Sequence, residues 1–199
     1  MTMPTRTRLI FAAAILLLAA VIGGVALTQR GTDSGSGEAL VGGPFRLTNH
    51  LGQTVTEADF RGKYMLVFFG FTFCPDICPT ELQVMTHALE TMGASGARIT
   101  PVFVTIDPER DTPDVMKAYV ENFGPNLVGL TGTPEEIAAV AKAYRVYYKK
   151  SGDSADYLMD HSSIIYLMGP DGRFVKHFTY TTDAGALAEG LTQAMADTP

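Results

Sequence analysis

The sequence has few charged residues, and it lacks a basic stretch in its main part. Charged residues make up 18% of the 199 positions and hydrophobic residues 46%, which excludes a disordered chain and favours one packed core. Three of the 15 basic and two of the 21 acidic residues lie in residues 1–43, so residues 44–199 carry 12 basic and 19 acidic residues, a net charge of −7. Because no basic stripe is present to neutralise phosphates, we expect no nucleic-acid binding.

Cysteine is also scarce, since Cys74 and Cys78 are the only two in the chain. Two cysteines are too few for an iron–sulfur cluster, which normally takes four. Structural zinc is disfavoured as well, because it takes four closed ligands and no second cluster of cysteine or histidine is evident. A structural disulfide would close a very short loop and would gain little chain-entropy stabilisation. The pair is therefore predicted to have a chemical role.

Charge is absent from residues 9–27, a run of 19 residues. At about 1.5 Å per residue this run nearly spans a hydrocarbon layer of about 30 Å. Two arginines precede it and predict a cytoplasmic N-terminus with the following chain exported. A cleaved signal peptide is the alternative, because Gly24 and Ala26 have a suitable spacing, but the run exceeds the usual core of about 7–15 residues. We predict that residues 1–27 are a cytoplasmic N-terminus and a single transmembrane anchor.

The remaining chain divides into a tether and one domain. Residues 28–43 are rich in glycine and serine and are predicted to be a flexible tether, and residues 44–199 form the domain. Strands are predicted near Phe45 and at residues 64–71, 99–106, 127–130, 163–168 and 173–178, and helices beginning near Pro79, Pro113, Pro134 and Ala184. The polar residues 149–156 are predicted to be mobile. This alternation indicates an α/β fold with a central mixed sheet.

Both cysteines follow the first buried strand, at the edge of the sheet where α/β folds bind ligands. Cys78 is predicted at or just before a helix N-terminus, whose positive end lowers a thiol pKa. The resulting thiolate attacks disulfides or binds metals, and three intervening residues let both sulfurs converge. Two thiolates select Cu(I), zinc or an iron–sulfur cluster. With the last two disfavoured, copper held by two sulfurs and one imidazole is the best match.

Three blocks of sequence carry a resemblance to a known family: FFGFTFCPDICPTEL (68–82), VTIDPERDTP (104–113) and YLMDHSSIIYLMGPDG (157–172). They resemble the Sco/SenC family, which comprises exported, thioredoxin-like copper proteins that assist assembly of the binuclear copper centre of cytochrome c oxidase. The resemblance covers the chain from about Pro44 to the C-terminus. It implies a thioredoxin-like fold, a central mixed β-sheet flanked by helices, with an N-terminal transmembrane helix and the domain on the periplasmic side of the inner membrane.

The resemblance also implies that Cys74, Cys78 and His161 bind copper, as Cu(I) or Cu(II). Asp160 is expected either to orient the imidazole or to be a plain surface residue. Asp76 either tunes the charge of the thiolates or is a solvated loop acid. Three further histidines, His50, His87 and His177, are expected at the surface and not as ligands. The methionines are predicted to be packing residues, Met159 being the one near the site, and the charged residues 107–111 to be a solvated loop that can shape the site.

Two functions are compatible with these residues. The first is a copper chaperone that passes copper to the copper-centre subunit of cytochrome c oxidase, with other periplasmic copper chaperones or thiol reductants as further partners. The second is a thiol–disulfide oxidoreductase in which Cys74 and Cys78 are catalytic and reduce cysteines of the oxidase copper site or of other exported proteins. A peroxidase of the peroxiredoxin type is disfavoured, because Phe71 stands where that family has a threonine. A redox or copper sensor stays open.

Overall fold

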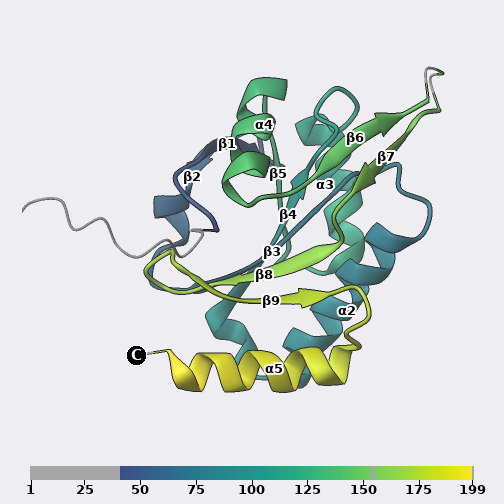
Figure 1. Ribbon diagram of the computed structural model, residues 1–199. Coiled ribbons are helices and arrows are strands. Elements are labelled where there is room, and N and C mark those ends of the chain that lie inside the picture. The colour runs from purple at the N-terminus through teal and green to yellow at the C-terminus, as the bar shows by residue number, and fades with distance from the viewer. Residues whose placement is uncertain (1–40, 153, 155, 199) are drawn as a thin grey trace, which may run out of the picture. The chain divides into compact units, whose positions relative to one another are not determined.

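The computed structural model describes residues 41–152, 154 and 156–198. A seven-stranded mixed sheet forms its centre, in the order β2-β1-β5-β4-β3-β8-β9 (Figure 1). The strands of this sheet are β1 (Arg46–Asn49), β2 (Thr54–Thr56), β3 (Tyr64–Gly70), β4 (Ile99–Thr105), β5 (Val128–Thr131), β8 (Ile164–Met168) and β9 (Phe174–Thr179). β3 is parallel to β4 and β4 to β5, while β8 is antiparallel to β3. The predicted α/β fold with a central mixed sheet is confirmed, and its arrangement fits the thioredoxin-like class.

The core forms around β3, whose seven residues are all buried. Neighbouring residues of a strand point to opposite faces, so Phe68 and Phe69 serve different layers. The ring of Phe69 packs on Tyr144 at 5.2 Å, and Tyr144 directly follows α4 (Pro134–Ala143). On the other face Phe68 stacks on Phe103, which meets Tyr119 of α3 (Pro113–Val120). The continuous apolar run therefore marks a strand buried on both faces, as predicted.

Helices complete the layers on both faces of the sheet. α2 (Ile77–Thr91) and α5 (Ala184–Asp197) lie side by side below it in Figure 1, with α4 above. Short 3-10 turns lie at Glu57–Phe60, Gly96–Arg98 and Glu121–Phe123. Thr112 caps α3 by accepting the Val115 N–H, and Thr133 caps α4, so both helices begin where the sequence predicts. α2 begins at Ile77, earlier than predicted. Pro79 is then its third residue, a position where a helical N–H has no intrahelical partner in any case.

A separate two-stranded ribbon projects from the sheet (Figure 1). β6 (Tyr148–Ser151) pairs antiparallel with β7 (Leu158–His161), with Tyr148 opposite His161. The prediction that residues 149–156 form a mobile polar segment is therefore wrong for the residues of β6. Their polarity reflects the exposure of the ribbon to water and not a lack of strand pairing.

The predicted membrane anchor, residues 1–27, and the tether up to residue 40 lie outside the described residues. In the part of the chain that the structure describes, no helix has the length and the apolar character needed to cross a bilayer. Val41 packs against the core, and the Gly42 N–H donates to the Ala143 carbonyl at 3.0 Å. The domain boundary at Pro44 stays a prediction.

Candidate metal centre

Cys74, Cys78 and His161 come together at the carboxyl end of β3. Cys74 lies in the loop after β3 and is partly exposed, Cys78 is fully buried in the first turn of α2, and His161 is the last residue of β7. Although 83 residues separate Cys78 from His161, Sγ of Cys78 lies 3.5 Å from Nε2 of His161. The Cys78 N–H donates to Sγ of Cys74 at 3.4 Å. Folding thus brings all three predicted residues to one point.

The spacing of these atoms suits a single metal ion. Two sulfurs and one imidazole nitrogen lie within 4.8 Å of one another. Bonds of about 2.0–2.3 Å from sulfur or nitrogen to a metal allow two ligand atoms to be at most about 4.6 Å apart. The three side chains therefore need to move by only tenths of an ångström to share one ion, and their soft sulfurs favour Cu(I).

The imidazole of His161 presents Nε2 to the sulfurs because its other nitrogen is already bonded. Nδ1 lies 3.2 Å from the Ser162 carbonyl, which can only accept, so Nδ1 carries the proton and Nε2 has a free lone pair. The ring centroids of Phe68 and Phe71 lie 6.1 and 6.0 Å from that of the imidazole, in edge-on contacts. Asp160, by contrast, is exposed and pairs in register with Lys149. A backbone carbonyl thus supplies the hydrogen bond that orients the imidazole.

The two thiols have opposite pKa shifts. A hydrogen bond from the Cys78 thiol, together with weaker ones from backbone N–H groups, lowers the pKa of Cys74. The neighbouring Cys74 sulfur, followed by burial, raises the pKa of Cys78. The prediction that Cys78 is the acidic thiol is therefore wrong. The Cys78 N–H in the first turn of α2 donates to the sulfur of Cys74, so the helix N-terminus stabilises that thiolate.

The other predicted candidates lie elsewhere. Nδ1 of His50 accepts the Gly129 N–H at 3.1 Å, whereas His87 and His177 are exposed. Asp76 is an exposed residue at the start of α2, and Met159 packs against the core. Among the described residues, Cys74, Cys78 and His161 are the one group of three or more cysteine, histidine or acidic side chains placed to hold a metal.

The prediction that residues 107–111 form a solvated loop is wrong for two of them, because Asp107 and Asp111 are buried. Asp111 accepts the N–H of Thr72 at 3.0 Å and the hydroxyls of Thr72 and Thr105 at 2.5 Å. Asp107 accepts the hydroxyl of Tyr157 at 2.7 Å. Hydrogen bonds compensate the buried carboxylates, and a run of charges alone does not reveal such partners. The one available signal was the position of this block directly after a buried strand.

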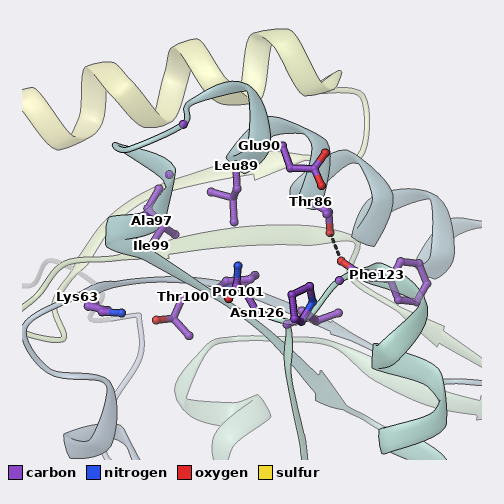
Figure 2. A pocket seen from close by; sticks show the side chains of 15 residues that line it. Lys63, Thr86, Leu89, Glu90, Ala97, Ile99, Thr100, Pro101, Phe123 and Asn126 are labelled. Carbon is purple, nitrogen blue, oxygen red and sulfur yellow. Dashed lines mark hydrogen bonds between the residues drawn. The ribbon is translucent and has the colours of Figure 1, made fainter.

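A pocket among the described residues lies at the other end of the sheet. It measures about 510 Å³ and is lined by the start of β4, the end of α2 and residues 123–127 (Figure 2). The Thr86 hydroxyl donates to the Phe123 carbonyl at its rim, at 2.9 Å. Lys63 and Glu90 are its charged lining residues. Since β3 runs from this end toward the cysteines, the pocket is not part of the metal centre.

Comparison with known proteins places this geometry in a family. The chain matches the SCO1/SenC family model over residues 33–196. It is 45% identical over 163 residues to the human protein SCO1 homolog, mitochondrial. The matched region covers 80% of this chain and 54% of that protein. The chain thus spans about half the length of such curated relatives.

Solved structures show the same relationship. The copper-bound structure of Arabidopsis thaliana ScoI has a TM-score of 0.76 and 46% identity, and the match covers 78% of this chain and 98% of that one. For copper-bound Bradyrhizobium japonicum ScoI the TM-score is 0.72 with 46% identity, over 77% of this chain and 99% of that one. With its matched length, its fold and its converging Cys74, Cys78 and His161, this chain belongs to the SCO1/SenC family.

Proposed function

We propose that this protein binds one copper ion through Cys74, Cys78 and His161 and passes it to the copper-centre subunit of cytochrome c oxidase. The observation that carries the proposal is the convergence of two sulfurs and one imidazole nitrogen within 4.8 Å. Copper-bound structures of two relatives with 46% identity support copper as the metal. Copper is here a cargo, taken up as Cu(I) or Cu(II) and released again.

The site has features that suit transfer. Cys78 is buried, whereas Cys74 and His161 are partly exposed, so a ligand from a partner can approach the metal from the side of these two residues. Three protein donors leave a position for an incoming thiolate or imidazole. Replacement of one donor at a time then moves the ion without releasing it to solvent.

The alternative function is thiol–disulfide exchange, and the pKa of Cys74 favours it. A partly exposed thiol with a lowered pKa attacks a target disulfide, forming a mixed disulfide and releasing one target thiolate. Cys78 then attacks the sulfur of Cys74 and gives up its proton to the second target sulfur, which leaves as a thiol, and a Cys74–Cys78 disulfide remains. Two electrons pass from this chain to the target. Reduction of the oxidase cysteines by this route would prepare them for copper.

The location follows from the N-terminal sequence. Residues 1–27 are proposed to anchor the protein once in the inner membrane, with the domain on the periplasmic side, where the subunit's copper site and further copper chaperones or thiol reductants are accessible. An acidic domain of net charge −7 suits a partner surface with basic residues.

The variant His161→Ala separates the two functions. A copper donor needs all three ligands, whereas a dithiol reductant needs only the cysteines. We expect His161→Ala to lose oxidase assembly in cells that lack the wild-type protein while still reducing a model disulfide, with His177→Ala as the matched control. Assembly at wild-type level by a His161→Ala protein that holds no copper would overturn the copper-transfer proposal in favour of the reductase.

A further inference from the structure

The segment between β4 and α3 contacts both elements that carry the candidate ligands. Asp111 bonds to Thr72, two residues before Cys74, through both the N–H and the hydroxyl of that threonine. Asp107 accepts the hydroxyl of Tyr157, the residue directly before β7, which ends at His161. Residues 107–111 therefore contact the cysteine loop through Asp111 and the β6–β7 ribbon, which carries His161, through Asp107.

Arg110 joins these two contacts. Its guanidinium carbon lies 3.7 Å from the ring centroid of Tyr157, 4.8 Å from that of Phe73 and 5.9 Å from that of Phe71. Its Nε donates to Asp107. Its two terminal nitrogens are buried and have no hydrogen-bond partner within the described residues. Contacts with aromatic faces and the single bond to Asp107 therefore hold the guanidinium in place.

The rings that Arg110 contacts belong to different ligand-bearing elements. Phe73 precedes Cys74 directly, and its side chain is half-exposed where Arg110 lies over its ring. Tyr157 is buried and belongs to the ribbon, where Lys150 of β6 lies 3.7 Å from the same ring. The ring of Phe71 also meets the imidazole of His161 at 6.0 Å. Arg110 thus connects the cysteine loop with Tyr157, which leads into β7 and which Lys150 of β6 also contacts.

The hydroxyl of Tyr157 stays a donor at neutral pH. Burial, followed by its hydrogen bond to Asp107, raises the pKa of Tyr157 to about 12. The link from the ribbon to residues 107–111 is therefore intact over the whole physiological range of pH.

We propose that Arg110 is a positioning residue that holds the ribbon against the cysteine loop, so that Nε2 of His161 faces the two sulfurs before metal arrives. The proposal rests on the assignment of Cys74, Cys78 and His161 as copper ligands. Without the stacked guanidinium, only a fraction of the metal-free molecules has the ribbon in the arrangement that binds copper. The measured copper affinity is then reduced by that fraction.

A double-mutant experiment tests this role through copper affinity measured by competition with a chelator. Arg110→Ala should weaken copper binding between about 3-fold and 30-fold, the range expected for lost cation–π contacts. In a His161→Ala background the same substitution should change affinity by less than about 2-fold, because the imidazole it positions is gone. Arg110→Lys should recover part of the loss, and Arg173→Ala, an exposed arginine paired with Asp171, should have no effect. An equal loss in both backgrounds, or none in either, would overturn the proposal.

Hydrogen exchange of the metal-free protein supplies a readout that does not depend on copper. Arg110→Ala should speed amide exchange in β6 and β7 and leave α5 unchanged, while Tyr157→Phe, which removes only the bond to Asp107, should do so to a smaller extent. Unchanged exchange in the ribbon would refute the positioning role even if copper affinity falls. If the wild-type protein binds no copper, the proposed function fails, whereas faster exchange in the ribbon would still support the link through Arg110.

Discussion

Sγ of Cys78 lies so close to the backbone of Gly70 that a Cβ added to Gly70 would be 2.7 Å from it and 2.9 Å from the ring of Phe103. Both neighbours are fully buried and have little room to move. Gly70→Ala should therefore displace Cys78 from His161. We expect weaker copper binding together with a loss of about 1–3 kcal/mol in the free energy of unfolding, measured with urea.

Gly43→Ala is the control for this substitution, because its added Cβ meets only Ala143, at an ordinary 3.7 Å. Its stability and copper affinity should match those of the wild type. A Gly70→Ala protein that binds copper as tightly as the wild type would show that the position of Cys78 against β3 does not matter for the site.

The opposite pKa shifts of the two thiols predict a difference in reactivity. A lowered pKa keeps Cys74 as thiolate as the pH falls from 8 to 6, whereas an ordinary cysteine, with a pKa of about 8.5, loses about tenfold in thiolate per unit. A raised pKa keeps Cys78 protonated throughout. A short iodoacetamide pulse on the reduced, metal-free protein at pH 6, followed by mass spectrometry, should find Cys74 modified well before Cys78. Faster reaction at Cys78 would contradict this order. In denaturant, as a control, the two cysteines should react at the same rate.

Substitution of each histidine in turn tests the ligand set. His161→Ala, like Cys74→Ser and Cys78→Ser, removes one of three donors and should weaken copper binding by orders of magnitude. His87→Ala and His177→Ala remove exposed rings and should leave the affinity unchanged, and His50→Ala should affect at most the stability of its turn through the lost bond to Gly129. Chelator competition measures all of them. Wild-type affinity in His161→Ala would point to another third ligand, with Met159 and Asp160 the next candidates.

The proposed anchor and tether predict that residues 44–199 fold without them. A fragment lacking residues 1–43 should be a soluble monomer that unfolds cooperatively. A fragment beginning at Val41 should be slightly more stable, because it keeps the bond from Gly42 to Ala143. In the full chain a reporter at the C-terminus should be active only outside the cytoplasm. Precipitation of both fragments, or a reporter active in the cytoplasm, would disprove the corresponding boundary or orientation.

Sequence patterns predicted the strands and helices that are buried on one face or on both faces. The apolar runs of β3 and β4 and the threonine caps of α3 and α4 depend on neighbouring residues, so the sequence reveals them directly. The resemblance to the family supplied His161, which no local pattern connects with cysteines 83 residues away.

Other features depended on contacts that are distant in the sequence. Which thiol is acidic depends mainly on the hydrogen bond between the two sulfurs and on the burial of Cys78, and the spacing of the cysteines does not specify it. The carboxylates of Asp107 and Asp111 looked solvated because Tyr157 and Thr72, which bond to them, lie 50 and 39 residues away. The β6–β7 ribbon was missed because its exposed polar residues resemble those of a loop.

The central claim is that one copper ion binds to the reduced pair Cys74 and Cys78 together with His161. Copper titration of the domain, with metal analysis of the product, tests it most directly. The reduced protein should bind about one copper per chain and protect both thiols from alkylation. The oxidised protein, whose Cys74–Cys78 disulfide offers no thiolate, should bind copper only feebly. Equal copper binding by the reduced and the oxidised protein would contradict the account.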